Sequence, residues 1–187
     1  MLARIANFAI GVGQRLTPWF VRRLVRSGDG ATAIEFALIA PPFLAMLVAI
    51  LETGMVFFFQ QVLQTSTTQA ARLIMTGQAQ TQKLTSAQFV QDVCSDAGAL
   101  FNCANLYANV QTFTSFSGMS MGSPVQNGTF SSSNLSFSPG GPGDIVLVQV
   151  FYQLPVSTAP LGFSLASTNT GNALLMATSV FRNEPYQ

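Results

Sequence analysis

The chain has 187 residues and a net charge of +1; only 8% of its residues are charged and 49% are hydrophobic. Ordinary soluble domains carry about 25% charged residues, so the length and composition favour one membrane segment followed by one modest domain. Because the chain contains no histidine, Ser-His-Asp and Cys-His nucleophile pairs are excluded.

The first 30 residues form a basic leader. They hold five arginines against one acid, Asp29, whereas residues 31–187 hold three basic and six acidic residues. Positive charge beside an apolar segment keeps that end in the cytoplasm, so we expect residues from about 60 onward on the outer side. The arginines are too few to indicate a nucleic-acid partner. The apolar residues of Leu2–Phe20 are compatible with an interfacial amphipathic helix.

A long apolar run follows, from Phe36 to Phe59. As a helix it would measure about 36 Å, enough to cross a hydrocarbon core of about 30 Å, and it exceeds the roughly 7–15 apolar residues of a secretory signal. We therefore predict a retained membrane-spanning helix over residues 31–59. Pro41 and Pro42 leave two interpretations open: a kink or local melting near residues 37–42, or a helix that starts at Pro41.

Two acids accompany this run. Glu35 stands at its start, where an acid is costly and calls for a functional explanation. Glu52 lies about 24 Å further along than Phe36, in the outer part of the bilayer. It is either an interfacial acid that reaches outward or a contact to another membrane helix, and the small residue Gly54 would allow a close helix approach.

Beyond the apolar run, the sequence predicts a continuation of the first helix and a second, short helix. Apolar and small residues recur at three- and four-residue steps beyond Phe59, so the first helix should continue to a stop at Gly77, giving one helix of about 40 residues. Thr85 and Gln88 have the spacing of a capping box. They predict a short second helix that ends near Gly98.

Strands follow in the C-terminal half. Asn105–Phe116 alternates partly, Ile145–Leu154 is continuously apolar and should be central, and Ala173–Arg182 is a further candidate. The segment Ser117–Gly143 reads as a long loop, with a weak strand near Thr129–Phe137. The sum is an α+β protein: a long N-terminal membrane-spanning helix, a short second helix, and a small three- or four-stranded antiparallel sheet in an outer domain of residues 60–187.

Cys94 and Cys103 are the two cysteines, and both fall on the expected outer side. An oxidising compartment favours a disulfide between them; two unpaired buried thiols are the alternative. One cysteine pair without histidine does not suggest a metal site. The acids Asp92, Asp96 and Asp144 are scattered and fit a solvated surface, so we expect a protein that is not an enzyme and has no cofactor and no small-molecule substrate.

Several stretches together resemble the TadE-like family, the pilin-like proteins of bacterial tight-adherence (Tad) pili. They cover the chain from about residue 22 to the end and comprise Gly28–Pro41, Ile50–Gly54, Cys94 with Cys103, and Val180–Tyr186. The combination carries the resemblance, since any one stretch alone would be weak.

The resemblance implies a pilin-type leader that a prepilin peptidase in the inner membrane cuts between Gly30 and Ala31. It also implies that Glu35, the fifth residue after the cut, helps peptidase recognition or subunit assembly. Cleavage would create a charged amine on Ala31, and Glu35 of a neighbouring subunit can neutralise that amine in lipid. The alternative is that Glu35 sits at the headgroup level.

The function expected from the resemblance is that of a minor pilin or pseudopilin, which initiates, caps or anchors a Tad-type type IV pilus used in surface adhesion. Its partners would be the membrane, the prepilin peptidase, other Tad pilins and the inner-membrane assembly platform. Its expected location is the bacterial inner membrane, as a single-pass protein with a periplasmic C-terminal domain, or the extracellular pilus. An uncleaved scaffold and a pilus-tip adhesin that uses Ser117–Gly143 remain alternatives.

Overall fold

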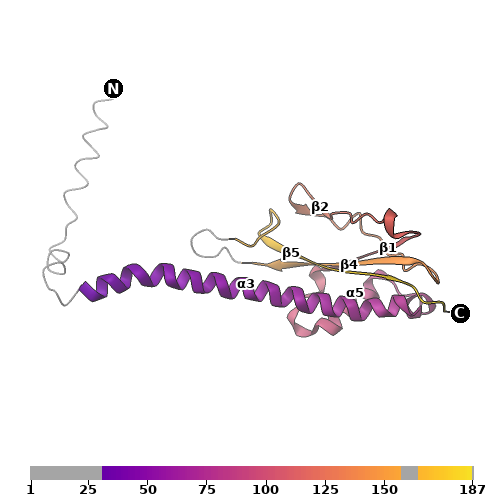
Figure 1. Ribbon diagram of the computed structural model, residues 1–187, viewed down its shortest axis with the longest axis horizontal. Coiled ribbons are helices and arrows are strands. Elements are labelled where there is room, and N and C mark those ends of the chain that lie inside the picture. The colour runs from indigo at the N-terminus through magenta and orange to yellow at the C-terminus, as the bar shows by residue number, and fades with distance from the viewer. Residues whose placement is uncertain (1–30, 157–163, 187) are drawn as a thin grey trace, which may run out of the picture. The chain divides into compact units, whose positions relative to one another are not determined.

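A computed structural model describes residues 31–156 and 164–186 of the chain (Figure 1). The leader, and with it Gly30 of the expected processing site, lies outside the described residues. Contacts divide the chain into two compact units, Met1–Leu47 and Val48–Gln187.

Helix α3 runs from Ala31 to Met75 and contains Pro41 and Pro42. The interpretation in which the helix starts at Pro41 is therefore wrong, and the expected melting near residues 37–42 is not found. Each proline removes one backbone donor, and an apolar helix of 45 residues tolerates this loss. The C-terminal end is as predicted, because Gly77 follows the helix in the left-handed conformation with φ 78°.

Two further helices belong to the unit Val48–Gln187. Helix α5, Ser86–Ala97, begins with the predicted capping box: the backbone N–H of Gln88 donates to Thr85 Oγ1 at 3.3 Å, and that of Thr85 donates to Gln88 Oε1 at 2.9 Å. The second predicted helix is thus confirmed. The short helix α4, Gln78–Thr81, was not predicted.

The sheet has three antiparallel strands in the order β1-β4-β5. Their bounds are Leu106–Phe113 for β1, Ile145–Pro155 for β4 and Asn172–Arg182 for β5. Strand β4 is central, as its continuous apolar content predicted, and its first eight residues are buried. A hairpin of two short strands, β2 (Val125–Gln126) and β3 (Thr129–Phe130), forms a second small sheet. The α+β fold class is confirmed.

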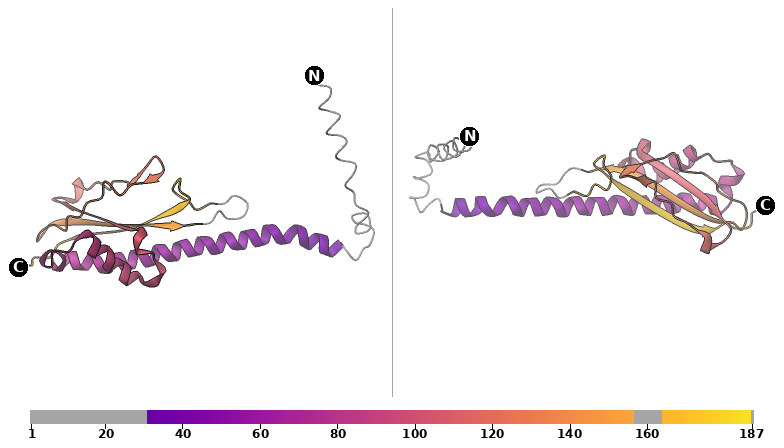
Figure 2. Two further views of the ribbon diagram at one scale, coloured as in Figure 1. Left: turned by 180° about the vertical axis from the view of Figure 1, so that it is seen from behind. Right: turned by 90° about the horizontal axis from the view of Figure 1, so that it is seen from above.

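The sheet of this unit is covered on both faces. One face packs on the C-terminal half of α3 and on α5 (Figure 2), and its core includes Leu63, Phe89, Val110, Val148 and Ala177. On the other face lies the segment between β1 and β4, where the Phe130 ring stands 4.9 Å from that of Tyr107 and 6.0 Å from that of Phe151. The segment predicted as a long loop thus packs on the sheet as a third layer.

The outer edge of β5 rests on α3. Gln60 Nε2 donates to the carbonyl of Met176 at 2.7 Å. Gln64 binds both backbone groups of Thr178: its Nε2 donates to the carbonyl at 3.0 Å, and its Oε1 accepts from the N–H at 3.2 Å. Open edges invite pairing with other chains, and these two side chains occupy part of this one.

Candidate membrane and assembly segment

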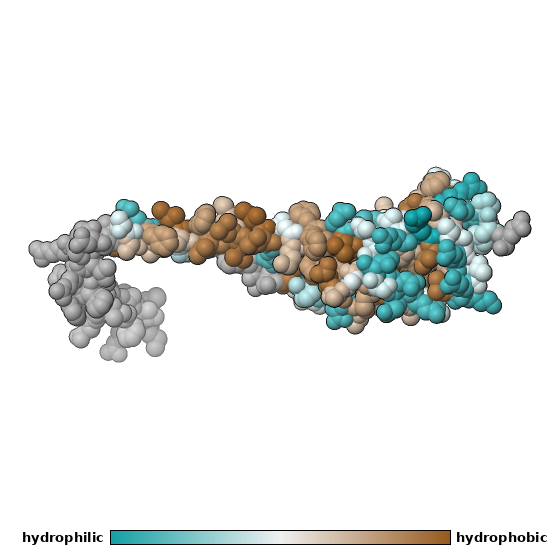
Figure 3. All heavy atoms as spheres, turned by 90° about the horizontal axis from the view of Figure 1, so that it is seen from below, coloured by the Kyte–Doolittle hydropathy of each residue, from teal (hydrophilic) through white to brown (hydrophobic). Residues whose placement is uncertain are grey.

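The first part of α3 presents apolar side chains to its surroundings. Phe36 is 73% exposed in the unit Met1–Leu47, and Leu51 is 70% exposed in the other unit. Figure 3 shows apolar residues covering the N-terminal part of α3, whereas polar residues predominate over the sheet-bearing part. Soluble proteins rarely leave apolar surface of this extent uncovered, so lipid or other helices are its natural surroundings.

Among the described residues, one helix is long and apolar enough to cross a membrane. This candidate span, Thr32–Met75, has a mean hydropathy of 2.3 over its most apolar window, and 6% of that window is buried. The buried core helix of a soluble protein would show the opposite. Over the residues that the structure describes, the chain therefore has the make-up of a single-pass membrane protein.

Glu35 and Ala31 occupy the start of this helix. Ala31 is the first residue of α3, and Glu35, which is exposed, lies four residues further on. Residues four apart are neighbours on one helix face and differ by about 6 Å along the axis. An amine on Ala31 and the Glu35 carboxylate would therefore lie on one face of the helix, about one turn apart along its axis.

Glu52 and Gly54 lie on different faces of α3. Glu52 is half-buried, and its Oε1 is enclosed without a hydrogen-bond partner among the described residues. Gly54 is exposed, and a Cβ built on it would have no heavy atom within 4 Å. Residues two positions apart in a helix differ by about 200° of rotation about its axis. The structure therefore does not bring the two predicted contact residues together. Each remains a separate predicted contact.

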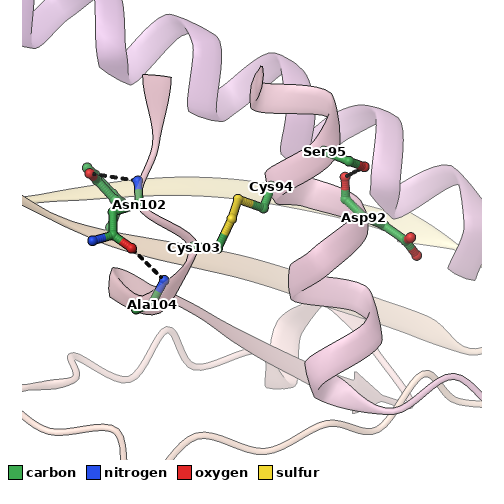
Figure 4. Close-up of a disulfide and its surroundings, with 7 residues drawn as sticks. Asp92, Cys94, Ser95, Asn102, Cys103 and Ala104 are labelled. Carbon is green, nitrogen blue, oxygen red and sulfur yellow. Dashed lines mark hydrogen bonds between the residues drawn. A yellow bond between two sulfur atoms is a disulfide. The ribbon is translucent and has the colours of Figure 1, made fainter. Parts of the chain in front are cut away.

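The disulfide between Cys94 and Cys103 is present, with 5.7 Å between the Cα atoms (Figure 4). The alternative of two unpaired thiols is therefore wrong. Cys94 belongs to α5, and Cys103 begins the 3-10 turn η3, Cys103–Asn105, which leads into β1. Next to it, the Ala104 N–H donates to Asn102 Oδ1 at 3.1 Å. The disulfide thus fixes α5 to the start of the sheet.

One acid of the unit Val48–Gln187 has a structural partner. Asp144 Oδ2 accepts from the Gly141 N–H at 2.8 Å and so closes the turn before β4. Within residues 31–156 and 164–186, no group of three or more His, Cys, Asp or Glu side chains is placed to hold a metal ion.

A groove beside β1 is the feature that sequence analysis missed. It encloses about 400 Å³ between α5, the start of β1 and residues 132–137. No sequence motif predicts this groove, because it forms only where residues 132–135 leave the edge of the sheet.

Comparison with known proteins finds one family. The model of the TadE-like protein family matches residues 30–72, which include Gly30, Ala31, Glu35, Glu52 and Gly54. No curated protein and no solved structure matches the chain. A TadE-like domain indicates a protein associated with Tad pili. Residues 30–72, from the expected cleavage point almost to the end of α3, thus match the TadE-like model, and the family resemblance is confirmed over this part of the chain.

Proposed function

We propose that this protein is a minor pilin or pseudopilin that takes part in assembling a Tad-type type IV pilus, where it initiates, caps or anchors the fibre. The observation that carries the proposal is the exposed apolar part of α3 within the TadE-like domain. A helix of this kind can sit in the inner membrane before assembly and among similar helices afterwards. Both environments cover the same apolar surface.

The processing step follows from the start of α3. A prepilin peptidase would hydrolyse the peptide bond between Gly30 and Ala31, which releases the basic leader and leaves a free amine on Ala31. This amine carries a positive charge. An unpaired charge in lipid is costly, so the Glu35 carboxylate of an adjacent subunit would stabilise it.

This pairing would also set the position of the subunits along the fibre. Ala31 and Glu35 lie one helical turn apart, so a carboxylate reaches a neighbour's amine only when the two helices are offset by about one turn. Charge neutralisation would then select one register out of many that bury the same apolar area. Support for this step comes from the helix geometry and the family match.

The test is the N-terminus of the mature protein. The full chain is expressed in bacteria with a Tad prepilin peptidase, and intact-mass measurement of membrane-derived protein should give a chain that begins at Ala31. Gly30→Trp places a bulky ring at the cleavage site and should leave the chain uncut. If the unmodified chain still begins at Met1, the protein is instead an uncleaved scaffold of the assembly machine.

A further inference from the structure

The outer edge of β1 is open at Ala108. In an antiparallel pair, successive residues point their backbone groups alternately toward and away from the partner strand. Val110 points away from β4, since its N–H donates to the Ser136 carbonyl at 2.7 Å and its carbonyl accepts from the Ser138 N–H at 2.8 Å. Ala108, two residues earlier, therefore points the same way, and none of the described residues pairs with its N–H or carbonyl.

Asn109 explains why the edge opens there. Phe137 forms a parallel bridge with Val110, and a continued parallel ladder would direct the Ser136 N–H to the Ala108 carbonyl. Instead this N–H donates to Asn109 Oδ1 at 2.9 Å. The Asn109 amide is itself held by a buried partner, because its Nδ2 donates to Gln149 Oε1 at 3.1 Å. The chain's own segment is thus turned away from the edge.

The open groups need partners from outside the described part of the chain. Ala108 is 5% exposed as a residue, and backbone donors and acceptors are paired in nearly all native structures, with protein or with water. The open groups face the groove lined by Ser86, Val90, Leu135 and Phe137. The lining has apolar and hydroxyl side chains and no charged residue. An uncharged backbone in extended conformation has the groups to pair with Ala108 and brings no charge into this lining.

The same chain contains an uncharged segment outside its helices and strands. Residues 119–123, Met-Ser-Met-Gly-Ser, form neither helix nor strand, and Met119 has an extended backbone with φ −71° and ψ 130°. Met121 is 68% exposed. In a strand, Met119 and Met121 would point to the same side, and methionine adapts well to irregular apolar grooves. We call residues 119–123 the methionine arm.

We propose that the methionine arm of one copy adds as a strand to the β1 edge of a second copy, pairing with the backbone of Ala108 and placing its methionines in the groove. Such a contact uses two different surfaces of the chain. A contact of this type is heterologous and, unless the rotation closes a ring, generates an open chain of subunits. It needs neither the apolar helix nor removal of the leader, so it stands or fails independently of the proposed processing.

Photo-crosslinking between isotopically distinct copies tests the contact. Full chains carrying photo-methionine are prepared with ¹⁴N and with ¹⁵N, mixed in detergent micelles, irradiated and digested with pepsin, because residues 84–181 contain no lysine or arginine for trypsin. We expect adducts between the arm and the groove segments that join one light and one heavy peptide. Adducts of a single isotope, or none in the groove, would refute the proposal.

Matched variants locate the contact. Ser132→Asp puts a carboxylate in the groove lining, and Met121→Asp puts one in the arm while Met119 still reports adducts. Burial of an unpaired charge is strongly unfavourable, so each should reduce the mixed adduct by about tenfold or more. Asn134→Asp adds the same charge on an exposed residue outside the lining and should leave the adduct unchanged. Equal effects of Ser132→Asp and Asn134→Asp would contradict the assignment.

Discussion

At the scale of single residues, Gly77 joins the end of α3 to the C-terminus of the chain. Its φ of 78° is in the left-handed region, and a Cβ on it would clash with the ring of Tyr186. Two residues before Tyr186, the Glu184 N–H donates to the carbonyl of Met75 at 2.9 Å. The C-terminal residues thus pack on the turn that ends the helix, and only glycine fits between them.

Gly77→Ala should therefore destabilise the protein. The left-handed conformation alone costs a residue with a Cβ about 1–2 kcal/mol, and displacement of the Tyr186 ring adds to this. The expected result is a lower thermal midpoint by circular dichroism of the full chain in detergent. Gly54→Ala is the matched control, because a Cβ there meets no atom within 4 Å and alanine favours helix. Equal midpoints for both variants and the unmodified chain would contradict this account.

At the scale of secondary-structure elements, the side chain of Gln64 protects the edge of β5. It bonds both the N–H and the carbonyl of Thr178, as a neighbouring strand would. Gln64→Ala should therefore expose this part of the edge. A backbone hydrogen bond contributes about 1 kcal/mol net, so hydrogen exchange at the Thr178 amide should accelerate about fivefold.

The control for this measurement is Gln61→Ala. Gln61 is exposed on α3, and within the described residues its side chain makes no hydrogen bond to β5. Its replacement should leave exchange at Thr178 unchanged. Equal acceleration in both variants would mean that a general loosening of α3, rather than the Gln64 contact, governs the edge.

The disulfide acts between elements, since it closes a short loop with nine residues of sequence separation between α5 and η3. Loop closure of this length contributes about 2–3 kcal/mol by restricting the unfolded chain. Replacing both cysteines by alanine should lower the free energy of unfolding by that amount, measured by urea titration in detergent. Reduction of the unmodified chain should give a similar loss. A variant as stable as the oxidised protein would contradict this role.

Local patterns were sufficient for most elements. The Thr85–Gln88 capping box and the stop at Gly77 gave helix ends close to those observed, and the apolar run after Asp144 gave the central strand. The β2-β3 hairpin was missed although its signal was present: Asn127-Gly128 has φ values of 51° and 75°, as a two-residue hairpin turn requires.

Features that depend on pairing between segments far apart in the chain could not be predicted from the sequence. The positions of Glu35, Glu52 and Gly54 in the apolar helix could be predicted, because helix geometry is regular. The binding of Gln64 to Thr178 and the open edge at Ala108 could not, since both arise where segments far apart in sequence meet. The alternative in which the helix starts at Pro41 was wrong, because the local cost of proline was weighed without the length of helix around it.

At the scale of the whole molecule, the chain combines a helix whose apolar residues are exposed with a unit that has its own covered core. The two kinds of surface ask for different surroundings. The exposed apolar residues near the middle of the run Phe36–Phe59 should be the most sensitive to charge if lipid covers them, because the penalty for a charge is greatest at the bilayer centre.

Leu47→Arg tests this. Leu47 is exposed and lies halfway along the run, where an arginine costs about 2.5–3.5 kcal/mol of insertion free energy. The fraction of full chain that resists alkaline carbonate extraction from membranes should fall sharply. Thr32→Arg adds the same charge at the basic end of the helix, where a long side chain can reach the headgroups, and should remain in the membrane. Extraction of both variants and of the unmodified chain alike would show that the apolar helix is covered by protein in a soluble assembly and not by lipid.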